Sequence, residues 1–172
     1  MSLTKSEAMA EILKSGKDPA YFINRYAKIS EPMKGLIPFD LYPFQEDALK
    51  IFNDHRFSVV LKARQLGIST TVAGYICWLM LFQREKNVLI VATKLQTATN
   101  LVKKVKSIHK HLPSWLKIAE ISINNRTSFE LSNGSQVKAS STSGDAGRSE
   151  ALSLLVVDEA AFVEGMDELW AG

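Results

Sequence analysis

Residues 59–71 restrict the possible fold more than any other part of the chain. The apolar residues Val59, Val60 and Leu61 come first, a mostly polar segment follows, and hydroxyl side chains begin at Ser69, two residues after Gly67. This order predicts a core strand over 57–62, a tight loop and the first turn of a helix that runs to about Arg84. A loop between a strand and a helix N-terminus presents successive backbone N–H groups that can surround a phosphate. The stretch therefore favours an α/β fold with an anion-binding loop.

The stretch matches the phosphate-loop pattern G-x-x-x-x-G-K-[ST] (Walker A) only in part. Gly67 falls on the second glycine, and Ser69 falls on the hydroxyl residue that reaches Mg²⁺. Lys62 stands in place of the first glycine, and Ile68 stands in place of the phosphate-binding lysine. A loop folded around phosphates could still bring Lys62 or Arg64 to them, and a cis-acting arginine is a known way to stabilise charge on the γ-phosphate. The alternative is that Lys62 is a strand-end residue in solvent.

A second apolar run, 152–157, ends in the adjacent carboxylates Asp158 and Glu159, which is the Walker B form. Ligands of open α/β sheets bind at the carboxyl ends of the strands, which favours a site there over an exposed pair of loop carboxylates. Asp158 could then hold Mg²⁺ together with the Ser69 hydroxyl, and Glu159 could orient and deprotonate the attacking water. We therefore predict a site for ATP and Mg²⁺. Its predicted nucleotide-binding residues are Gln45, Lys62, Ala63, Arg64, Gln65, Leu66, Gly67, Ile68, Ser69 and Thr70.

Size and composition are compatible with one domain. The chain has 172 residues, 46% of them hydrophobic and 23% charged, and a net charge of +3, which permits a nucleic-acid partner without indicating one. The single Cys77 excludes an internal disulfide. Charged residues interrupt the first 14 positions, so we expect no signal peptide. The apolar run 72–82 is too short to span a bilayer, and we expect it to be a buried helix.

The order of elements predicts a three-layer α/β core with a mostly parallel sheet and a β-hairpin excursion. We expect a lead-in over 1–40, with helices after Thr4 and Asp18 and an extended connection over 31–43. The core over 41–172 should then contain further helices over 44–52 and 95–111, a buried strand over 87–93 and alternating strands over 118–139. The Asn133–Gly134 pair is a strong hairpin signal within the alternating region.

Three further features have alternative interpretations. Gln45, preceded by Tyr42 and Phe44, could hydrogen-bond an adenine edge, although a solvent-facing helix glutamine is the default. Arg148 lies in a Ser/Gly-rich loop and could contact a phosphate, DNA or a neighbouring subunit, or be solvated. The lysines of the 95–111 helix more often form a solvated face than a DNA groove, and the three histidines have no metal-ligand spacing.

Several of these segments together resemble the large terminase subunits of tailed bacteriophages, the ATPases that pump DNA into empty capsids. The similar segments occur in the same order over nearly the whole chain after Asp18. They are Asp18–Phe22, Leu41–Gln45, Ala63–Thr70, Asn133–Ser135, the loop ending in Arg148, and Val156–Ala160. The resemblance implies a RecA-like P-loop NTPase core that couples ATP hydrolysis to movement of double-stranded DNA.

The resemblance also implies roles and partners. Gln45 would recognise adenine, Arg64 and Glu159 would be catalytic, and Ser69 and Asp158 would serve Mg²⁺. Ile68 departs from members with lysine there, whereas other members place their lysine where Lys62 stands. The implied partners are double-stranded DNA, the portal protein and the small terminase subunit, with a possible ring oligomer and no membrane. The implied location is the cytoplasm of an infected bacterial host, at the procapsid portal.

Family members continue into a second ATPase subdomain and a nuclease, which are absent from these 172 residues. We therefore interpret the chain as the incomplete ATPase segment of a larger motor, weakly active alone and without nuclease activity. The alternatives are a helicase-like nucleic-acid translocase and a catalytically inactive P-loop binding module, the latter suggested by Ile68.

Overall fold

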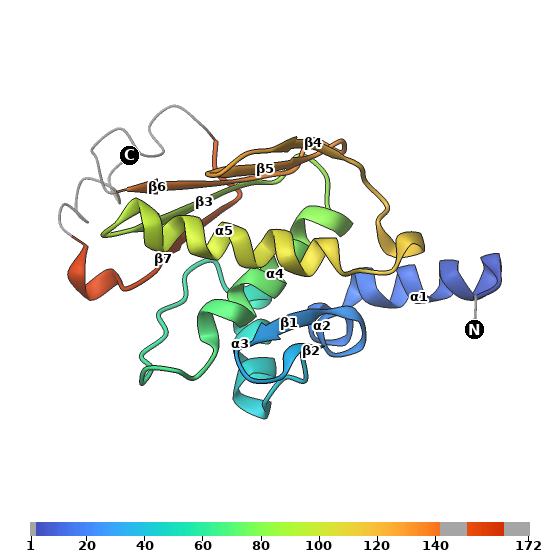
Figure 1. Ribbon diagram of the computed structural model, residues 1–172, viewed down its shortest axis with the longest axis horizontal. Helices are drawn as coiled ribbons and strands as arrows, with labels where there is room; N and C mark the ends of the chain where they lie inside the picture. Colours follow the sequence, from blue (N-terminus) through green and yellow to red (C-terminus); the bar gives the residue numbers. More distant parts are fainter. Residues whose placement is uncertain (1–2, 142–150, 164–172) are drawn as a thin grey trace.

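The computed structural model describes residues 3–141 and 151–163 (Figure 1). Within these ranges, none of the helices combines the length and apolarity that crossing a membrane requires. The loop expected over 140–149, including Arg148, falls almost wholly outside the described residues, as does most of the segment after Val163.

The amino-terminal helices begin where the sequence predicts. Helix α1 (Lys5–Lys17) is preceded by a capping box, in which the Thr4 N–H donates to Glu7 Oε2 at 2.8 Å and the Glu7 N–H donates to Thr4 Oγ1 at 3.3 Å. Helix α2 (Pro19–Tyr26) starts with Asp18, whose carboxylate accepts the Ala20 N–H at 2.8 Å. Helix α3 (Pro43–Asp54) follows, so three predicted helices are confirmed.

The extended connection predicted over 31–43 is partly wrong. Strands β1 (Lys28–Glu31) and β2 (Gly35–Pro38) form an antiparallel pair, with Gly35 in the left-handed region at φ +72°. The glycine permits the turn that brings the two strands together. Helix α2 ends at Tyr26, so Ile29 lies in β1.

The main sheet has five strands in the order β4 (Ile121–Asn124), β5 (Ser128–Leu131), β6 (Gln136–Ser141), β3 (Asn87–Ala92) and β7 (Leu154–Val157). Strand β3 pairs in parallel with β6 and with β7, whereas the β4–β5 and β5–β6 pairs are antiparallel. The predicted hairpin at Asn133–Gly134 is confirmed, with Gly134 at φ +81°. The sheet is thus mixed rather than mostly parallel, because the hairpin belongs to the main sheet instead of projecting from it.

Helices α4 (Ile68–Phe82) and α5 (Leu95–Lys110) build the core below this sheet (Figure 1). Helix α5 packs on β3 and β6, α4 packs on α5, and α2 and α3 pack on α4. The apolar α4 is therefore surrounded by protein, which explains its composition. The described helices all lie on one side of the sheet, so the described ranges contain two of the three predicted layers.

The strand predicted over 57–62 is wrong. These residues have no regular structure and are exposed; the side chain of Val59 is 99% exposed and that of Leu61 is 100% exposed. Strand propensity describes how a side chain fits a pleated, half-buried surface, and it produces a strand only where another strand accepts the backbone hydrogen bonds. No strand of the described residues pairs with this segment.

Candidate functional site

The structure brings together two side chains that are far apart in the sequence. Ser69 lies in the first turn of α4, and Asp158 follows directly after β7. The Asp158 N–H donates to the Val91 carbonyl at 2.9 Å, which continues the parallel pairing with β3 and fixes where β7 ends. The Ser69 hydroxyl donates to Asp158 Oδ2 at 3.2 Å. The start of α4 and the end of β7 therefore meet at one edge of the sheet.

Gly67 shapes the loop that leads into α4. It has φ +72°, in the left-handed region, and caps the helix, with its carbonyl accepting the Thr70 N–H at 2.9 Å and the Thr71 N–H at 3.0 Å. Glycine adopts this conformation without the steric penalty of a side chain. The N–H groups of Ile68 and Ser69 precede the first hydrogen bonds of the helix, so they have no acceptor within α4 and are available to an anion.

Gln45 holds this loop from the first turn of α3. The residue is only 2% exposed, so the default of a solvent-facing glutamine is wrong. Its Nε2 donates to the Leu66 carbonyl at 3.0 Å, and its Oε1 accepts the Tyr42 N–H at 3.1 Å. Sequence alone gave no signal for this anchoring contact, because it joins two segments through a single side chain. Recognition of adenine by Gln45 stays a prediction.

The two predicted cations are exposed, whereas Ile68 is buried. Lys62 and Arg64 are exposed, as are Ala63, Gln65 and Leu66. Ile68 is only 8% exposed and points into the protein, so the residue at the usual lysine position does not face the loop opening. A lysine that we did not predict contacts the start of α4: Lys104, on α5, donates from Nζ to Thr70 Oγ1 at 3.0 Å.

Glu159 is exposed and has left-handed backbone geometry, with φ 57° and ψ 41°. Its N–H donates to Asp158 Oδ1 at 3.1 Å, which holds the two acidic residues in a compact turn. Gln65, in the loop before α4, is also left-handed at φ 64°. Residues other than glycine adopt this conformation at a cost, and such residues are frequent at functional sites.

A hydroxyl and a carboxylate are suitable partners for Mg²⁺, which prefers oxygen ligands and is usually held by few protein groups plus phosphates and water. Ser69 and Asp158 supply such a pair of oxygen groups, and both residues are partly exposed, so a ligand can reach them. Groups of three or more His, Cys, Asp or Glu side chains suited to a metal are absent from the described ranges.

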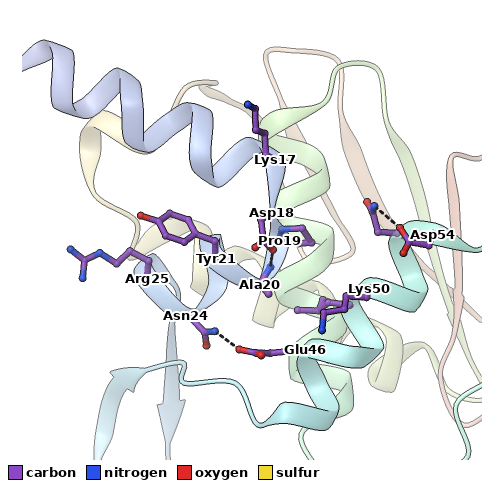
Figure 2. A pocket seen from close by; sticks show the side chains of 12 residues that line it. Lys17, Asp18, Pro19, Ala20, Tyr21, Asn24, Arg25, Glu46, Lys50 and Asp54 are labelled. Atoms are coloured by element: carbon purple, nitrogen blue, oxygen red, sulfur yellow. Dashed lines mark hydrogen bonds between the residues drawn. The ribbon is translucent and has the colours of Figure 1, made fainter.

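A hollow of about 570 Å³ lies elsewhere, between α2 and α3 (Figure 2). Its polar groups largely serve the fold: Asn24 donates to Glu46 Oε1 at 2.8 Å, and the Asp18 carboxylate caps α2. None of the predicted site residues lines it. We therefore place the candidate site at the start of α4 and not in this hollow.

Comparison with known proteins shows the family to which the chain belongs. The family model described as "Terminase large subunit, T4likevirus-type, N-terminal" matches residues 59–171. The crystal structure of the HK97 bacteriophage large terminase is similar in fold, with a TM-score of 0.71 at 19% sequence identity. That similarity covers 91% of this chain and 34% of the HK97 chain, so the chain spans about a third of that protein's length. The chain belongs to the T4-like-virus type of the large terminase subunit family and corresponds to its amino-terminal region.

Proposed function

We propose that this chain is the ATP-binding and ATP-hydrolysing part of a viral motor that moves double-stranded DNA into a procapsid. Family membership supports the motor, and the 3.2 Å contact between Ser69 and Asp158 supports the nucleotide site. The proposal treats α4, β3 and β7 as part of a RecA-like P-loop core. A loop, a helix N-terminus and a carboxylate at the end of a neighbouring strand are the parts that such a core needs.

In this proposal each group of the site has one task. The backbone N–H groups at the start of α4 bind the phosphates, and the positive end of the helix dipole strengthens that binding. Ser69 and Asp158 hold Mg²⁺, which neutralises phosphate charge when it is bound. The exposed Glu159 carboxylate orients a water molecule and accepts its proton. The Arg64 guanidinium approaches the γ-phosphate once the loop closes around it.

The partners follow from the proposed motor. They are double-stranded DNA, the portal protein and the small terminase subunit, with the full-length protein acting as a ring at the procapsid portal in the cytoplasm of the infected bacterium. Because the chain spans about a third of the HK97 subunit, we assign it the nucleotide-binding step and leave the grip on DNA to the complete protein.

The test compares nucleotide binding and turnover in four proteins: the parent chain, Ser69→Ala, Asp158→Asn and, as a control, Asp47→Asn. Asp47 lies on the exposed surface of α3, where its carboxylate pairs with Lys50 at 3.1 Å. Both site variants should lose Mg²⁺-dependent binding of ATP, measured by calorimetry, whereas Asp47→Asn should bind as the parent does. Equal binding by all four proteins would refute the proposed site.

The buried Ile68 favours a second candidate function, a module that binds nucleotide without turning it over. Glu159→Gln separates the two functions, because it removes the proposed base and keeps the side-chain shape. A parent that binds ATP and hydrolyses it no faster than Glu159→Gln would leave only the inactive module. The comparison is best repeated with the full-length protein and DNA.

A further inference from the structure

Lys104 reaches the candidate site from a separate helix. It lies midway along α5, and its Nζ donates to Thr70 Oγ1 at 3.0 Å. Thr70 directly follows Ser69, whose hydroxyl is bound to Asp158. The ammonium group therefore lies against the first turn of α4, although α5 was not among the elements predicted to form the site.

The electrostatic surroundings of Lys104 are those of a cation without a full counter-charge. Burial of the ammonium group lowers the pKa of Lys104, Asp158 acts in the opposite direction, and Lys62 adds to the lowering. The ammonium group is thus partly desolvated although the side chain as a whole keeps contact with water. Neither Lys62 nor Lys104 has an ion-pair partner among the described residues. Two ammonium groups in the range of one carboxylate leave positive charge that an anion would balance.

The position at which a phosphate loop normally carries its lysine is filled here by Ile68, which is buried. Lys62 and Arg64 belong to an exposed segment without regular structure, and no hydrogen bond among the described residues holds either side chain. Lys104 is different, because α5 is a helix packed on β3 and β6 and its ammonium group is already held by a hydrogen bond. A cation that is positioned before binding loses less entropy when the ligand arrives.

From this arrangement we propose that Lys104 binds the phosphate chain of the nucleotide, supplying from α5 the positive charge that Ile68 cannot supply. The proposal rests on the function proposed above and adds a residue to the same site. When nucleotide binds, the ammonium group donates a hydrogen bond to a phosphate oxygen. This bond replaces the hydrogen bond to the Thr70 hydroxyl or forms beside it. No bond is made or broken, and the proton stays on the lysine.

The competing explanation is a purely structural one, in which Lys104 ties α5 to α4 through Thr70. The two explanations differ in what they require of the side chain. A phosphate contact needs the charge, so arginine should serve and methionine should not. A structural tie to a neutral hydroxyl contributes to the stability of the free protein, so its loss should appear in the unfolding free energy without any nucleotide.

The experiment measures binding of adenylyl imidodiphosphate with Mg²⁺ by calorimetry, and urea unfolding without nucleotide. The variants are Lys104→Met, Lys104→Arg and the control Lys103→Met. Lys103 is the preceding residue on α5 but lines a separate hollow with Lys106 and His109. We expect Lys104→Met to weaken binding by about tenfold or more, as for a lost hydrogen bond between charged groups. Lys104→Arg should keep most of the affinity, and Lys103→Met should bind like the parent.

Parent-like affinity of Lys104→Met would overturn the proposal and leave the proposed function intact. The proposal would also be overturned if Lys104→Arg lost as much affinity as Lys104→Met. It would equally be overturned if the loss of affinity in Lys104→Met came with a loss of unfolding free energy. If the parent chain fails to bind the analogue, the proposed function falls, and the role of Lys104 falls with it.

Discussion

His109 should make the stability of this protein depend on pH above the range in which carboxylates titrate. The residue is only 3% exposed, its ring packs edge-on against Phe129 with centroids 5.2 Å apart, and its Nε2 has no hydrogen-bond partner among the described residues. Burial, together with the nearby charge of Lys117, lowers the pKa of His109 from 6.5 to about 4. The folded protein therefore contains neutral His109 at pH values at which the unfolded chain has begun to protonate it.

The sign follows from proton linkage. Between pH 6.5 and 4 the unfolded state binds more protons at His109 than the folded state does, so the unfolding free energy rises with pH in this window. The contribution is fully present above about pH 6.5, is lost as the pH falls, and is gone once the folded protein also takes up the proton near pH 4. A difference of this size corresponds to about 3 kcal/mol in total, of which about 2 kcal/mol is lost between pH 7.5 and pH 5.

The assay is urea unfolding followed by circular dichroism at half-unit steps from pH 7.5 to pH 5. Ending at pH 5 limits the contribution of Glu11, because bonds from Tyr26 and Tyr21 hold the pKa of its carboxyl at about 2 and its effect on stability comes at lower pH. His109→Leu should flatten the curve, since no titrating group remains at that position. His55→Leu, at the exposed residue after α3, should keep the slope of the parent. A parent curve that is flat, or a His109→Leu curve as steep as the parent, would refute the reasoning.

Three further substitutions test the loop and the helix that position the candidate site. Gly67→Ala places a Cβ 2.8 Å from Gln45 Nε2 at a residue with φ +72°. We therefore expect the unfolding free energy measured in urea to fall by about 2 kcal/mol. An unchanged urea midpoint would contradict the left-handed conformation of Gly67. Gln45→Met removes the donor to the Leu66 carbonyl and should speed amide hydrogen exchange at the start of α4; unchanged exchange would mean that the loop is held by other contacts. Asn133→Asp keeps the acceptor for the Ser135 N–H but removes the donors to two carbonyls near the end of α4. The unfolding free energy should fall by about 1–2 kcal/mol. An unchanged unfolding free energy would show that water satisfies the two carbonyls.

The elements that sequence predicted well are those whose signals are local. The capping box at Thr4 and Glu7 needs only residues three apart, and the Asn133–Gly134 turn needs only the left-handed conformation that glycine allows. The apolar run of β3 indicated a strand buried on both faces, and its residues from Val88 to Ala92 are all buried. In each case the residues that carry the signal are also the residues that form the structure.

The errors occurred where a distant partner decides the outcome. Val59 and Leu61 have the propensity of a strand, but pairing depends on an available edge, and sequence does not say whether an edge is available. Sequence predicted nucleotide binding for Gln45, with a solvated side chain as the default, and it favoured a solvated face for the lysines of the 95–111 helix, which include Lys104. Gln45 and Lys104 each contact the start of α4 across a packing interface, and only the relative placement of helices reveals such contacts.

The meeting of Ser69 and Asp158 lies between these two cases, because sequence predicted it through topology. Strand β7 pairs in parallel with β3, and backbone bonds hold both of its ends: the Ser153 N–H donates to the Asn87 carbonyl at 2.8 Å, and the Asp158 N–H donates to the Val91 carbonyl at 2.9 Å. Asp158 is thus positioned by the sheet, whereas Ser69 is positioned by the Gly67 turn and the packing of α4. Because α4 and the sheet set the distance between Ser69 and Asp158, and the exposed segment before Gly67 does not, we expect this proposed metal-binding pair to keep its geometry when residues of that segment are substituted. The proposed phosphate-binding half depends on the loop, unless α5 contributes its lysine.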